Sequence, residues 1–162
     1  MNPFSHGAKV VAGTPLGNEL AELGWRPVHG ISPYGPLWTQ LEVFAVKAGG
    51  GVTGAILLMK AFVVAAVLGS AFLIWKILGK MRPADRMLGT LLFLWNPLVI
   101  VEFGGEGHND AAMILFVLAA LYFWLFGREV LSYLALGLGV FTKYLPLMFL
   151  PALVFQFWPK KG

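Results

Sequence analysis

The sequence contains no cysteine and few charged residues. Charged residues make up 12% of its 162 positions and hydrophobic residues 58%, whereas soluble domains have about 25% charged and about 45–50% apolar residues. The absence of cysteine excludes disulfide bonds and cysteine-ligated metals. The net charge is +4, but no basic stripe with interleaved aromatic residues is present, so no nucleic-acid partner is expected.

The hydrophobic residues are gathered in long apolar segments. Residues 55–78 exceed the roughly 20 apolar residues that a helix needs to cross a bilayer. We therefore predict an all-α protein, with a polytopic transmembrane helix bundle over residues 53–158. Its apolar segments are 55–78, 88–103, 111–126, 130–142 and 144–158.

The charged loops indicate how this bundle is oriented. The loop KILGKMRPADRM at 76–87 has four cations and one acid, and Lys and Arg are enriched in cytoplasmic loops. The next turn, GGEGHND at 104–110, is therefore predicted to face the outside of a multi-pass protein of the cell membrane.

The last apolar stretch allows two topologies. Its halves, 130–142 and 144–158, would each reach roughly 20 Å as helices, which is short of the roughly 30 Å hydrocarbon core. A hairpin of two short helices would hold Lys143 in a recess below the outer surface. The alternative is one kinked span that ends outside. Lys160 and Lys161 indicate an inner end, which favours the hairpin.

The front of the chain lacks a long apolar run. Residues 1–34 are predicted to form an external loop, and Pro36 favours the first turn of a helix over 35–48 that ends at three glycines. This helix is too short to span a bilayer, so we predict that it lies in the interface, with Glu42 in solvent. No apolar helix precedes these residues to carry them outside, so either the N-terminus crosses the membrane unaided or the chain is a fragment.

The turn GGEGHND places Glu106, His108, Asn109 and Asp110 between two apolar runs. One interpretation is that Asn109 or Asp110 only caps the helix beginning at Ala111. The other uses the preference of a helix N-terminus for anions. The residues alone leave both interpretations open.

Three stretches together resemble one family. They are NPF (2–4) with SPYGPLW (32–38), WNPLVIVEFGGEGHNDAAM (95–113) and GLGVFTKYLPLMFLP (137–151). In this order they are similar to the GT-C superfamily of membrane glycosyltransferases, in particular to polyprenol-phosphomannose-dependent alpha-mannosyltransferases of bacterial cell-envelope synthesis. The resemblance implies transfer of a sugar from a polyprenyl-phosphate donor to a glycan or glycolipid acceptor, with an extracytoplasmic active face.

The resemblance also implies roles for single residues. His108, Asn109 and Asp110 would face the donor phosphate or sugar, and Tyr34 would line the sugar site. Lys143 would partner the lipid phosphate; alternatively, it extends its ammonium to the outer interface. The resemblance also implies that the family's first membrane helix and its catalytic base, an acidic residue, lie upstream of Met1, and that the family's C-terminal helices are missing. We therefore expect this chain to be a fragment that is inactive alone.

A phosphate next to Asp110 would be repelled unless His108 is protonated or a divalent cation lies between them. Mg²⁺ or Mn²⁺ would suit phosphate oxygens, with Asp110 and Glu106 as candidate ligands. Lys60 has no motif around it and is predicted only to reach the interface.

Two further classes of function stay open. A transporter or a flippase for lipid-linked sugars would also use short, broken helices, although no convincing repeat relates residues 35–103 to 104–158. A small assembly subunit without chemistry is the third possibility.

Overall fold

The computed structural model describes residues 13–22, 24, 34–149 and 151. The chain divides into two compact units, Met1–Tyr34 and Gly35–Gly162. The regular elements of the described residues are all helices, which confirms the predicted all-α class.

The first unit contains one element that the sequence analysis missed. Residues 1–34 were predicted as a loop, but α1 spans Pro15–Glu22. The Gly17 N–H donates a hydrogen bond of 3.1 Å to Thr14 Oγ1, and Pro15 occupies the first helical position. A capping threonine followed by proline is a helix-start signal that the loop prediction overlooked.

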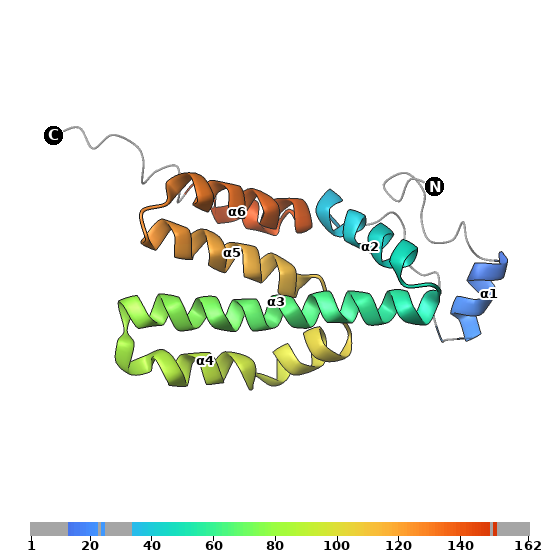
Figure 1. The fold of residues 1–162 in the computed structure, drawn as a ribbon, viewed down its shortest axis with the longest axis horizontal. Helices are drawn as coiled ribbons and strands as arrows, with labels where there is room; N and C mark the ends of the chain where they lie inside the picture. Colours follow the sequence, from blue (N-terminus) through green and yellow to red (C-terminus); the bar gives the residue numbers. More distant parts are fainter. Residues whose placement is uncertain (1–12, 23, 25–33, 150, 152–162) are drawn as a thin grey trace. The chain divides into compact units, whose positions relative to one another are not determined.

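The second unit is built along α3, Val52–Met81 (Figure 1). α3 has 30 residues, which corresponds to about 45 Å of helix. Among the described residues, it is the one helix that is long and apolar enough to cross a membrane by itself. Its buried positions are mostly small, which lets other helices approach closely; they are Val63, Ala66, Ser70, Ala71 and Ile77.

The segment 88–103 is broken into two helices, as predicted from Pro97, which lacks the N–H that a continuous helix needs. A short 3₁₀ turn, η2 (Pro83–Asp85), leads into α4 (Arg86–Leu94), and η3, a π-helix, spans Val99–Gly105. The two parts bend by 54°. Pro97 has no N–H to continue the first helix, and Asn96 Oδ1 accepts a hydrogen bond from the Leu98 N–H at 2.9 Å. The two parts would form a second span if counted together.

Two shorter helices form an antiparallel hairpin beside α3. They are α5 (Asp110–Leu125) and α6 (Glu129–Thr142), close to the predicted 111–126 and 130–142. Buried Ala120 and Ala135 allow close packing, and the Ser132 hydroxyl donates to the Ala120 carbonyl at 2.8 Å. This hydrogen bond satisfies a buried polar group inside an apolar interface.

The predicted segment 144–158 is described only at its start. After α6 the chain is extended at Lys143 and then forms a short 3₁₀ helix, η4 (Leu145–Phe149), instead of an α-helix. Pro146 has no N–H to donate to an α-helix. Residues 150 and 152–158 lie outside the described residues.

The helices of this unit alternate in direction (Figure 1), so the polar residues near their termini lie at two ends of the unit. α3 and α5 begin at the end where η3 and α6 finish. We call this the polar end; it carries Lys60, Glu102, Glu106, His108, Asp110 and Lys143. The opposite, cationic end carries Lys76, Lys80, Arg82, Arg86 and Arg128. The remaining helix, α2 (Pro36–Ala48), contacts α3 and α6 near the polar end.

Candidate functional site

The polar end brings Asp110 and Lys143 into direct contact. Lys143 Nζ lies 2.7 Å from Asp110 Oδ1, and the two side chains are 35% and 28% exposed. Asp110 begins α5 and Lys143 directly follows α6, so the antiparallel hairpin closes a separation of 33 residues. The structure therefore places Lys143 next to the polar turn, residues 104–110. The choice between the two topologies of residues 130–158 stays a prediction, since residues 150 and 152–158 lie outside the described residues.

The turn before α5 does not serve as a side-chain cap. Asn109 occupies the N-cap position but makes no side-chain capping hydrogen bond. Its carbonyl accepts from Ala112 and Met113, and its side chain is buried, with 3% of the residue exposed. Its Nδ2 has no acceptor among the described residues. The capping interpretation is therefore wrong for Asn109, while Asp110 binds Lys143.

His108 is held by Glu102, whose orientation the sequence leaves open. His108 Nε2 lies 3.2 Å from Glu102 Oε2, and the His108 backbone N–H donates to the Glu102 carbonyl at 3.1 Å. Glu102 is on η3, and π-helical turns are rare and frequent at functional sites. A lone Glu in an apolar run was the available signal, and the structure shows that this Glu, on the π-helix, contacts His108.

Lys60 is also part of the polar end, where it has a hydrogen-bond partner that the sequence did not predict. Its Nζ donates a hydrogen bond of 2.6 Å to the Gly105 carbonyl, where η3 ends. Gly107, two residues after Gly105, has a φ of +77°, a backbone conformation that glycine adopts readily. Lys60 thus ties α3 to the polar turn.

A backbone hydrogen bond joins the start of α2 to the end of α6. The Gly35 N–H donates to the Thr142 carbonyl at 3.0 Å, next to Lys143. A Cβ at Gly35 would lie 2.1 Å from the Phe141 carbonyl oxygen, so only glycine fits this approach. Tyr34 is half-buried and ends the first unit; its role at the sugar stays a prediction.

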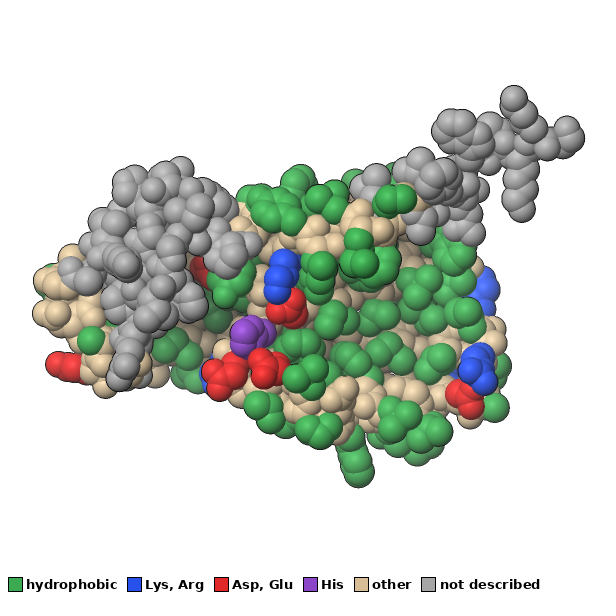
Figure 2. Space-filling model, turned by 180° about the vertical axis from the view of Figure 1, so that it is seen from behind, with side chains coloured by type: hydrophobic (Ala, Val, Ile, Leu, Met, Phe, Trp, Pro, Cys, Tyr) green, Lys and Arg blue, Asp and Glu red, His purple; other side chains and the backbone are tan. Residues whose placement is uncertain are grey.

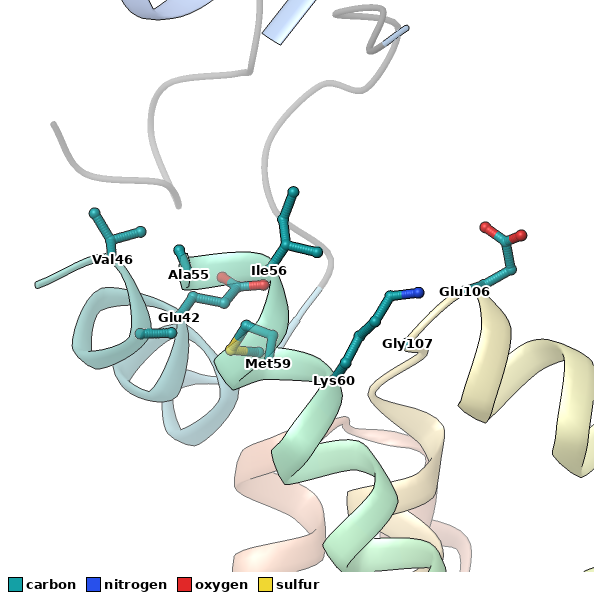
Figure 3. A pocket seen from close by; sticks show the side chains of 9 residues that line it. Glu42, Val46, Ala55, Ile56, Met59, Lys60, Glu106 and Gly107 are labelled. Carbon is teal, nitrogen blue, oxygen red and sulfur yellow. The ribbon is translucent and has the colours of Figure 1, made fainter. Parts of the chain in front are cut away.

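A cavity of about 280 Å³ opens between α2, α3 and the polar turn (Figure 3). Its walls are mostly apolar, with Glu42, Lys60 and Glu106 as its charged lining residues. Glu42 was predicted in solvent, but burial raises its pKa above the ordinary 4.5, while a hydrogen bond from the Trp38 side chain acts in the opposite direction. Because α2 packs on α3, Glu42 faces this cavity.

Figure 2 shows acidic, basic and histidine side chains gathered in one patch of a largely hydrophobic face. Within the described ranges, no group of three or more His, Asp or Glu residues is placed to hold a metal ion. A cation between Asp110 and a phosphate would need fewer protein ligands, and Lys143 already contacts that carboxylate. The metal role of Asp110 and Glu106 stays a prediction.

The comparisons with known proteins give one match for the chain as a whole. A family model described as alpha-(1→6)-mannopyranosyltransferase, N-terminal domain, matches residues 1–159. No curated protein and no solved structure matches the chain. The match includes the polar turn, Lys143 and the start of α2.

Proposed function

The chain belongs to the alpha-(1→6)-mannopyranosyltransferase family, and we propose that its polar end binds the phosphate of a polyprenyl-phosphate mannose donor. The family is one of glycosyltransferases, which need a sugar donor and an acceptor. In the proposed reaction an acceptor hydroxyl, deprotonated by a carboxylate, attacks the anomeric carbon. The bond from that carbon to the phosphate oxygen breaks, and polyprenyl phosphate leaves. The acceptor is a glycan or glycolipid of the cell envelope.

The contact between Lys143 and Asp110 is the observation that carries this proposal. An ammonium has three N–H donors, so Lys143 can keep its 2.7 Å contact with Asp110 and still donate to a phosphate. Phosphate gains negative charge as it leaves, and a cation held in place stabilises that charge. Asp110 then acts as a positioning residue that holds the ammonium beside the start of α5.

The rest of the polar end suits an anion in the same place. The N-terminus of α5 carries a partial positive charge of roughly half an elementary charge. In its protonated form, His108 can keep its 3.2 Å contact with Glu102 through Nε2 and offer Nδ1–H as a further donor. The repulsion expected between Asp110 and phosphate is offset by Lys143, and a divalent cation such as Mg²⁺ or Mn²⁺ would add to this effect when bound.

We further propose a multi-pass arrangement in which the polar end faces the extracytoplasmic side. α3 can span the bilayer, and Lys and Arg at the cationic end favour the cytoplasm. α5 and α6 have 16 and 14 residues, about 24 Å and 21 Å, less than the roughly 30 Å core. The start of α5 would therefore lie below the membrane surface, where a lipid-linked phosphate can reach it.

Transfer measured in detergent tests this proposal. The full-length enzyme containing this chain is given radiolabelled polyprenyl-phosphate mannose and an acceptor oligosaccharide, and Lys143→Ala is compared with Lys76→Ala at the cationic end. We expect Lys143→Ala to lower kcat/KM by roughly 100-fold and Lys76→Ala to leave it unchanged. An unchanged rate in Lys143→Ala would refute the phosphate site. Because detergent removes sealed compartments, a transporter or flippase cannot imitate this product.

A further inference from the structure

The cavity beside the polar turn is separate from the contact between Lys143 and Asp110. It is lined by α2, α3 and the turn, which contribute Glu42, Lys60 and Glu106 respectively. In the view of Figure 3, the Lys60 side chain lies between those of Glu42 and Glu106. The other lining residues are apolar or glycine: Ala45, Val46, Ala55, Ile56, Met59 and Gly107.

We infer that this cavity binds the pyranose ring of a hexose, with Glu42 and Glu106 accepting hydrogen bonds from its hydroxyl groups and Lys60 donating to one. The inference rests on the proposed function, because it assigns a sugar subsite beside the proposed phosphate site. The ring belongs either to the donor or to the acceptor, and the two sources are separated by the experiment below.

The charges of the cavity decide between classes of ligand. The two carboxylates outnumber the one ammonium, so the cavity repels an anionic ligand such as a phosphate. A purely apolar chain would remove water from these three groups without offering hydrogen bonds, which is costly. A hydroxyl both donates and accepts, so a neutral polyhydroxylated ring satisfies the carboxylates and the ammonium together. Its C–H faces can pack against the apolar walls.

The size of the cavity limits how much ligand it holds. Its volume of about 280 Å³ lies at the lower end of the roughly 300–1,000 Å³ usual for small-molecule sites. This space suits one ring more than an oligosaccharide. A longer glycan would continue out through the open side of the cavity.

The cavity and the proposed phosphate site share one turn of the chain, residues 104–110. Glu106 and Gly107 line the cavity, and His108 and Asp110 follow directly in the same turn. Lys60 fixes this turn through its 2.6 Å hydrogen bond to the Gly105 carbonyl. A ring in the cavity and a phosphate at Lys143 would therefore lie on either side of one short turn.

Binding of methyl α-D-mannopyranoside to the full-length enzyme tests the inference. Saturation-transfer NMR in detergent is compared for wild type, Glu42→Gln, Glu106→Gln and the matched control Glu129→Gln, whose carboxylate is exposed at the start of α6. We expect each cavity variant to weaken mannoside binding, or the KM for the donor, by about tenfold, since each loses a hydrogen bond to a charged group. Glu129→Gln should change neither value.

The two sources of the ring give different results. Weaker binding of the free mannoside, with an unchanged donor KM, assigns the cavity to the acceptor. A raised donor KM, with no binding of the free mannoside, assigns it to the donor. If neither value changes in Glu42→Gln and Glu106→Gln, the inference is overturned.

A second kind of variant separates loss of sugar binding from loss of folding. Val46 lines the cavity and is 67% exposed, so Val46→Trp should fill the space without disturbing buried packing, and it should have the same effect on sugar affinity. Thermal melting verifies that it folds. Normal hexose binding in Lys143→Ala together with unchanged transfer would refute the phosphate site alone. Loss of transfer in Lys143→Ala with no effect of the cavity variants would refute this inference alone.

Discussion

The contact between Lys143 and Asp110 predicts a measurable coupling energy. At 2.7 Å, Coulomb's law gives about 1.5 kcal/mol at the dielectric constant of water and about 6 kcal/mol at an effective value of 20. About a third of each side chain is exposed, so solvent screening and side-chain entropy reduce this strongly. We expect a coupling of about 1 kcal/mol, at the upper end of values for exposed pairs.

A double-mutant cycle measures this coupling. The free energy of unfolding in detergent is determined for wild type, Lys143→Met, Asp110→Asn and the double variant. Arg82 and Asp85 provide the matched control, since their contact is 2.9 Å but their side chains are 75% and 46% exposed. Their coupling should be no more than about 0.3 kcal/mol. A Lys143–Asp110 coupling as small as that of the control pair would refute the geometry on which the proposed site depends.

Three further predictions concern the surroundings of the site. Gly35→Ala should lower the free energy of unfolding by about 1–3 kcal/mol, because its Cβ would lie 2.1 Å from the Phe141 carbonyl oxygen; an unchanged melting curve would contradict this contact. Burial raises the pKa of Glu42, so its stabilising protonated form is lost as the pH rises through that pKa. Glu42→Gln should therefore melt higher than wild type at pH 7 but not at pH 4, and a gap independent of pH would count against burial. Ser132→Ala should cost about 1 kcal/mol in urea unfolding, since it leaves the buried Ala120 carbonyl without its 2.8 Å side-chain hydrogen bond; a neutral result would mean that the carbonyl is otherwise satisfied.

The helices could be predicted from sequence because their ends carry strong local signals. Pro36 begins α2, Gly127 with a φ of +70° separates α5 from α6, and Pro97 breaks the segment 88–103. The apolar runs between these signals gave the bounds of α3, α5 and α6 to within a few residues. Thr14 and Pro15 gave a similar signal for α1, which was missed because the surrounding segment has no apolar run.

The site could be predicted only in part. Charge patterning placed His108 and Lys143 at one end, which the direction of the helices supports. The roles of Glu102, Lys60 and Glu42 depend on tertiary contacts that no sequence pattern records. Glu102 contacts His108 from a π-helix, and the positions of Lys60 and Glu42 follow from the packing of α2 and η3 on α3.

The most direct test of the proposed phosphate site is the affinity of the full-length enzyme for polyprenyl phosphate without a sugar. This ligand isolates recognition of the phosphate from the sugar and the acceptor, and competition with labelled donor in detergent gives its Kd. The proposal predicts that Lys143→Ala raises this Kd by about tenfold or more, while Lys76→Ala does not change it. An equal Kd in wild type and Lys143→Ala would contradict it.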